Sequence, residues 1–146
     1  MLEAGYGPLT AVHDSAKVTL GTRYEENGKV YIYLKGAASV VAKDVVTYDE
    51  NYAVTRLVAN AVGPVAVALA AVVANKYGWF QIYGNASVNS DTVAADKALY
   101  IDASTGRVDD AAVTGDLILG MTSTDQDTTN VLPVFLNYPH VTDILG

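Results

Sequence analysis

The two histidines of the chain are the first residues to consider for catalysis, because imidazole exchanges a proton near neutral pH. They are His13 and His140, and they stand near opposite ends of the sequence. His13 is followed by Asp14 and Ser15, which together supply the residue types of a hydrolase triad. Consecutive side chains in an extended segment point in alternating directions, so these three cannot pass a proton in line. The sequence also lacks a G-x-S-x-G elbow, a P-loop and a G-x-G-x-x-G fingerprint, and we expect neither a catalytic residue nor enzymatic activity.

Metal binding would depend on aspartates, because the chain contains no cysteine. Asp125, Asp127 and Asn130 form one candidate group, and Asp109–Asp110 is a second. An EF-hand loop also needs a central glycine and a glutamate at its twelfth position, which the first group lacks. Paired carboxylates for glycoside hydrolysis stay open, because their separation depends on the fold. We interpret residues 122–130 as a solvated loop and expect no metal and no cofactor.

Aromatic residues offer a different chemistry. Trp79 is the single tryptophan, Tyr77 and Tyr83 flank it in the sequence, and Tyr100 follows later. Exposed on one face, these rings would form a platform on which a sugar could stack. Tryptophan and tyrosine are more often buried in a core or in the centre of a subunit interface. We therefore interpret Trp79, Tyr83 and Tyr100 as anchors of the core or of an interface between subunits, with the sugar platform as the alternative.

The charge of the chain excludes some classes of partner. The formal net charge is −7, from 9 basic and 16 acidic residues, and no Lys or Arg follows Arg107. Phosphate backbones would be repelled, so we expect no binding to nucleic acid. Charged residues make up only 17% of the chain, below the roughly 25% of ordinary soluble domains. Such a weakly charged surface suits contact with other protein.

One uncharged stretch, residues 57–75, approaches the length of a membrane span. It contains Asn60 and the pair Gly63–Pro64, and it is rich in alanine, which lipid hardly favours. We interpret it as buried core and expect no contact with a membrane. We also expect no signal peptide, because the first basic residue is Lys17 and the start of the chain is mixed in character.

Alternation of apolar and polar residues predicts short β-strands. Residues 29–35 alternate aliphatic with aromatic side chains directly after an Asn-Gly turn signal at 27–28. Residues 65–75 fit a strand followed by a turn, with Pro64 restricted to its start, although 71–76 would also fit a helical turn. Further strands are expected at 44–48, 54–59, 78–84, 97–102, 107–110, 117–121 and 131–138.

This spacing of strands and turns is typical of an all-β fold. We predict a compact antiparallel β-barrel or a β-tulip or sandwich domain over residues 23–146. Residues 1–22 show neither period and contain several glycines and a proline, so we predict that they form an extended N-terminal arm.

Three segments carry a resemblance to a known family. They are YGWFQIYG at 77–84, LYIDASTGRVDD at 99–110 and GDLILG at 115–120. Through them, residues 44–138 resemble the small head decoration, or cement, proteins of tailed bacteriophages. The resemblance implies a virion structural protein that binds the outer surface of the capsid as a homotrimer, clamps subunits of the major capsid protein and stabilises the shell.

In such a protein the arm is free to add a strand to the exposed sheet edge of a neighbour. We expect its capsid contacts to come from Leu2, Tyr6, Leu9 and Val12. The alternative function is a carbohydrate-binding or host-attachment β module that uses Trp79 and nearby tyrosines.

Overall fold

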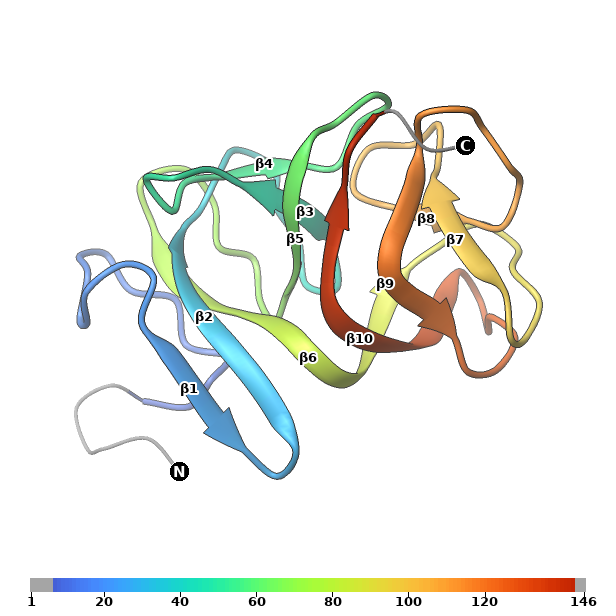
Figure 1. Cartoon of the computed structure of the whole chain (residues 1–146). Helices are drawn as coiled ribbons and strands as arrows, with labels where there is room; N and C mark the ends of the chain where they lie inside the picture. Colours follow the sequence, from blue (N-terminus) through green and yellow to red (C-terminus); the bar gives the residue numbers. More distant parts are fainter. Residues whose placement is uncertain (1–6, 144–146) are drawn as a thin grey trace.

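The computed structural model describes residues 7–143, and within that range the only regular secondary structure is β-strand. Ten strands form one sheet in the order β1-β2-β6-β5-β10-β9-β7-β8, with β3 and β4 joined to it through β5 (Figure 1). Neighbouring strands run antiparallel throughout. The all-β prediction is confirmed. The sheet does not close into a barrel, because its terminal strands β1 and β8 do not pair with each other in the described residues, and the barrel form of the prediction is wrong.

Most strands follow the alternation in the sequence, with differences at their ends, but the strand at residues 23–26 was not predicted. In the first half of the chain they are β1 (Arg23–Glu26), β2 (Lys29–Lys35), β3 (Val45–Tyr48), β4 (Val54–Arg56) and β5 (Gly63–Ala68). In the second half they are β6 (Tyr77–Asn89), β7 (Ala98–Ile101), β8 (Val108–Asp109), β9 (Leu117–Ser123) and β10 (Val131–Val141). Residues 69–76 are turns and bends, so the strand-then-turn interpretation of 65–75 is confirmed.

Strand β5 explains why valine alternates with alanine in this part of the sequence. Val65 and Val67 point into a cluster formed mainly by the second half of the chain. Ala66 and Ala68 point into a second cluster, formed by residues of the first half and of β6. Both faces of β5 are therefore buried, with large side chains on one face and small ones on the other.

Strand β6 is longer than predicted, because Gly84 bends it instead of ending it. The first part of β6 pairs with β2 and β5, and the part after Gly84 pairs with β10. Gly84 has φ +96°, and a Cβ there would lie 2.8 Å from the carbonyl oxygen of Gly28. The Gln81 amide donates hydrogen bonds to the carbonyl oxygens of Tyr83 (3.0 Å) and Asn85 (2.8 Å), so polar backbone groups at the bend are satisfied.

Strand β10 contains a bulge that turns one tyrosine outward. Leu136 pairs with Met121 of β9, but the next pair in this ladder is His140 with Leu119, so β10 has extra residues between the two pairs. Tyr138 lies in this bulge with φ +47°. Bulges of this kind re-aim side chains relative to a regular strand. The Tyr138 side chain is 46% exposed as a result.

A third cluster lies on the outer side of β2 and β6, and we call it the aromatic cluster. Its buried members are Tyr31, Tyr33 and Trp79. The partly buried side chains around it include Val18 and Leu20, which come from the segment before β1.

No helix in residues 7–143 is long and apolar enough to cross a bilayer.

Candidate interaction surface

The segment before β1 lies along the body of the protein. His13 and Tyr77 exchange backbone hydrogen bonds of 2.8 Å and 3.0 Å. The Tyr33 hydroxyl lies 2.7 Å from His13 Nδ1 and accepts a hydrogen bond from the backbone N–H of Lys17 at 3.1 Å. The His13 ring therefore takes part in holding this segment to β2 and β6. His140, the other histidine, is exposed on β10.

An exposed ion pair adds to this attachment. The Lys76 ammonium contacts the Asp14 carboxylate. Its hydrogen bond and positive charge hold the pKa of Asp14 below the ordinary value of 3.8. Ser15, the third residue of the triad-like sequence, is exposed.

The four residues assigned to the arm have different environments. Leu9 is partly buried against the aromatic cluster, so its side chain contacts its own chain. Val12 is 39% exposed and available for contact with a partner. Leu2 and Tyr6 lie outside the described residues.

Trp79 is at the centre of the aromatic cluster and is 2% exposed. Its ring lies 5.1 Å from that of Tyr33 in an edge-to-face arrangement and 6.1 Å from that of Tyr24. The indole N–H is buried and has no hydrogen-bond partner among residues 7–143. Trp79 therefore presents no ring face to solvent on which a sugar could stack.

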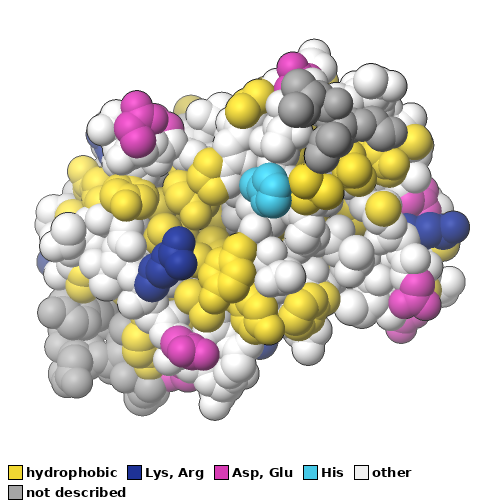
Figure 2. Space-filling model, in the orientation of Figure 1, with side chains coloured by type: hydrophobic (Ala, Val, Ile, Leu, Met, Phe, Trp, Pro, Cys, Tyr) yellow, Lys and Arg dark blue, Asp and Glu magenta, His cyan; other side chains and the backbone are white. Residues whose placement is uncertain are grey.

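Tyr83 belongs to a different group of rings, which we call the aromatic row. Its other members are Phe135 and Tyr138 of β10, whose ring centroids lie 5.5 Å and 5.2 Å from that of Tyr83. The guanidinium of Arg23, on β1, lies 5.8 Å from the centre of the Tyr138 ring. On the face of the molecule that Figure 2 shows, hydrophobic side chains gather in the middle, over the region where β2, β5, β6 and β10 lie.

Tyr100 is separate from both groups. It is half-buried on β7 and pairs with Asp109 of β8. The structure thus places Trp79, Tyr83 and Tyr100 in three different environments. Sequence reasoning missed Tyr138 because only the bulge makes it prominent.

Three carboxylates that are not adjacent in the sequence converge at β7 and β8. Asp91, Asp102 and Asp109 each offer an oxygen, and these oxygens lie within 4.8 Å of one another. Asp102 is buried and accepts a hydrogen bond from the backbone N–H of Ser104 at 2.8 Å. The adjacent pair Asp109–Asp110 gave no indication of this cluster, because its members are brought together by the pairing of β7 with β8 and by the contact of the segment after β6 with Val108.

The polar loop after β9 uses its carboxylates for local structure. Asp125 accepts a hydrogen bond from the backbone N–H of Gln126 at 2.8 Å. Asp127 accepts one from the backbone N–H of Val93 at 2.9 Å and thereby ties the loop to the segment after β6.

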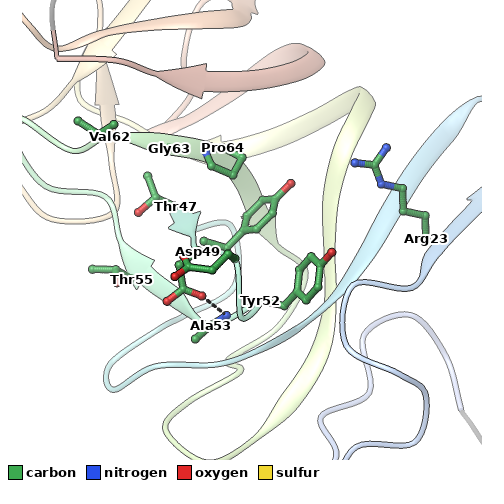
Figure 3. Close-up of a pocket in the computed structure, with 11 residues that line it drawn as sticks. Arg23, Thr47, Asp49, Tyr52, Ala53, Thr55, Val62, Gly63 and Pro64 are labelled. Atoms are coloured by element: carbon green, nitrogen blue, oxygen red, sulfur yellow. Dashed lines mark hydrogen bonds between the residues drawn. The ribbon is translucent and has the colours of Figure 1, made fainter.

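A groove of about 650 Å³ lies beside the aromatic row. Its walls come from the start of β1, the hairpin of β3 and β4, and the start of β5 (Figure 3). The side chains most relevant to binding are Arg23, Tyr48, Asp49, Glu50, Tyr52 and Pro64. None of these was predicted as a site residue, because they come from three segments that only the fold brings together.

Tyr48 lines the groove and is half-buried. Burial raises the pKa of its phenol, although the nearby charge of Arg23 opposes the shift. The hydroxyl therefore stays protonated at neutral pH and remains able to donate a hydrogen bond.

Comparison with known proteins adds no family assignment. A scan against protein-family models and a search of curated proteins each find no match to this chain.

Proposed function

We propose that this protein is a capsid decoration protein of a tailed bacteriophage. It binds the outer surface of the assembled head as a homotrimer, contacts the major capsid protein and stabilises the shell without catalysing a reaction. The identity of the partner comes from the resemblance of residues 77–84, 99–110 and 115–120 to that family. The mode of action is supported by the surface of the molecule.

The observation that carries the proposal is the aromatic row with Arg23 above it. Tyrosine and arginine are enriched among the residues that dominate binding energy at protein interfaces. Tyr138 is held outward by a bulge in which a non-glycine residue adopts a positive φ, a conformation with an intrinsic cost of about 1–3 kcal/mol. Such strain persists where the surrounding structure enforces it, and it is concentrated at functional positions.

Trimerisation would let modest contacts give tight attachment. Once one subunit is bound, the other two face their sites at a high effective concentration, so the combined affinity exceeds that of a single copy. A weakly charged surface avoids the cost of desolvating many charges at each contact.

Sedimentation and head binding test the proposal together. Purified protein is expected to sediment as a trimer and to raise the temperature at which undecorated heads burst. Tyr138→Asn removes the ring while keeping a residue that tolerates positive φ, and it is expected to weaken head binding at least tenfold. Val113→Ala, at a 47% exposed position outside the row, is the matched control and is expected to bind normally. A monomer that leaves the heads unchanged would refute the proposed function.

The contribution of the N-terminal segment needs a point substitution instead of a deletion. Removing residues 1–22 would also remove Leu9, Val18 and Leu20 from the aromatic cluster, so a loss of binding would not separate docking from folding. Val12→Asp changes an exposed side chain and leaves that packing intact. We expect it to weaken head binding with an unchanged unfolding midpoint, and unchanged binding would exclude Val12 as a capsid contact.

A further inference from the structure

We propose that the groove between β1, the β3–β4 hairpin and the start of β5 binds a neutral saccharide. This groove shares Arg23 with the aromatic row, but binding there does not depend on the proposed function. Its volume of about 650 Å³ is within the range of roughly 300–1,000 Å³ that is usual for small-molecule sites.

The groove is held in shape before any ligand arrives. Asp49 Oδ1 accepts hydrogen bonds from the backbone N–H groups of Asn51 (2.9 Å) and Ala53 (3.1 Å), which fixes the carboxylate at the tip of the hairpin (Figure 3). Only one carboxylate oxygen is used in these bonds. A carboxylate has further acceptor capacity, so Asp49 can still accept hydrogen bonds from a ligand.

Tyr52 is fixed by its backbone and by Gly21. Its φ is +60°, and its N–H donates to the carbonyl oxygen of Asp49 at 2.9 Å. A Cβ at Gly21 would lie 2.5 Å from the Tyr52 ring, so the absence of a side chain there lets the ring rest against this turn. The ring remains 38% exposed.

The groups around the rings include both hydrogen-bond donors and acceptors. Asp49 and Glu50 accept hydrogen bonds, Arg23 donates them, and the hydroxyls of Tyr48 and Thr55 can do both. A sugar presents alternating hydroxyl donors and acceptors together with a face of C–H groups. Its hydroxyls would meet the polar groups, and its C–H face would cover an aromatic ring in place of water.

The charged side chains that line the groove carry both signs. The two carboxylates oppose an anionic ligand, and the guanidinium of Arg23 opposes a cationic one. A neutral ligand with many hydroxyls can donate hydrogen bonds to the carboxylates and accept them from Arg23, without repulsion from either charge. A basic peptide would use the carboxylates and the rings but would leave Arg23 repelled, so we treat it as the competing occupant in the test.

The experiment uses the intact protein in solution. Saturation-transfer NMR and calorimetry are run with maltohexaose, cellohexaose and chitohexaose, and in separate arms with trilysine and with citrate. At least one neutral hexasaccharide is expected to bind, and trilysine and citrate are not. Absence of binding by all three saccharides, or binding by trilysine or citrate instead, overturns the proposal.

Paired substitutions locate the site. Tyr52→Ala is expected to weaken saccharide binding about tenfold, whereas Tyr52→Phe, which keeps the ring, is expected to weaken it less. Glu50→Gln is also expected to weaken binding about tenfold, because it removes hydrogen bonds to a charged acceptor. Glu25→Gln, an exposed carboxylate on β1 that does not line the groove, is the matched control.

Folding and function are checked separately. The amide NMR spectrum and unfolding midpoint of each variant show whether the hairpin is intact, and Glu50→Gln leaves no buried group unpaired. Saccharide binding that is unaffected by both Tyr52→Ala and Glu50→Gln places the sugar elsewhere and overturns the proposal. Because the measurements need no phage heads, a failure here is distinct from a failure of the decoration function.

Discussion

Asp44 holds the β3–β4 hairpin to the rest of the sheet. Because this hairpin forms part of the groove wall, replacing Asp44 tests how the fold supports the groove. The side chain is 1% exposed. Its Oδ2 accepts hydrogen bonds from the backbone N–H of Val41 (3.1 Å) and from Arg56 Nε (2.7 Å). Its Oδ1 accepts them from Arg56 Nη2 and Asn89 Nδ2, each at 3.3 Å. One carboxylate thus connects the segment before β3 with β4 and β6.

The size of the effect follows from which groups are left unpaired. Asp44→Ala leaves the Val41 N–H and the guanidinium without their acceptor, and removing one partner of a buried ion pair typically costs about 3–5 kcal/mol of unfolding free energy. Arg56 is 26% exposed and can partly regain water, so we expect a value near the lower end. Arg56→Met leaves the buried carboxylate with two donors and is expected to cost about as much. Because each single substitution already destroys the pair, the double variant should cost much less than the two added together.

Urea unfolding followed by Trp79 fluorescence measures these differences at several protein concentrations, so that any oligomer is accounted for. Asp44→Asn keeps the shape of the side chain, is expected to lose less stability than Asp44→Ala, and serves if the alanine variant does not fold. A loss below about 1 kcal/mol for Asp44→Ala, or strict additivity in the double variant, would refute this account of the pair.

Three further predictions concern other parts of the molecule. Gly120→Ala is expected to lower the unfolding free energy by at least about 1–3 kcal/mol, because φ is +78° and the new Cβ would lie 2.6 Å from the carbonyl oxygen of Asn137; an unchanged urea midpoint would contradict this. Lys76→Met is expected to raise the pKa of Asp14 towards 3.8, as measured by an NMR titration. In the unchanged protein the ion pair stabilises the fold above pH 3.8, and this stabilisation is lost as the pH falls through the lowered pKa of Asp14. Trp79, at 2% exposure, should resist quenching by acrylamide, and quenching like that of free tryptophan would show that the aromatic cluster is open in solution.

The strands could be predicted from the sequence where one local signal decides the structure. The alternation at 29–35 gave β2 with its bounds, because each apolar residue there repeats at the two-residue period of a strand. The Val/Ala alternation in β5 was informative for the same reason. The class of the fold therefore follows from residues 23–141 without knowledge of long-range contacts.

The irregular positions could not be predicted in this way. Gly84 ends a run of aromatic residues and is equally compatible with a strand end or a bend, and the partner strand β10 decides between them. The outward Tyr138 depends on extra residues relative to β9, which only the pairing register reveals. The groove combines segments that are distant in sequence, and the cluster of Asp91, Asp102 and Asp109 combines three separate positions that only the strand pairing brings together.

Arg23 connects the two candidate binding surfaces. Its guanidinium lies over the Tyr138 ring of the aromatic row, and the same side chain lines the groove that contains Tyr52. When a ligand draws the guanidinium into the groove, Arg23 must therefore lose or weaken its cation–π contact with Tyr138. Such a contact is worth about 0.5–1 kcal/mol at an exposed site. Binding at one surface thus changes the affinity of the other surface for its partner by no more than a few-fold. This small coupling is why Tyr138→Asn and Tyr52→Ala, which leave Arg23 in place, separate the two proposals better than any substitution of Arg23 itself.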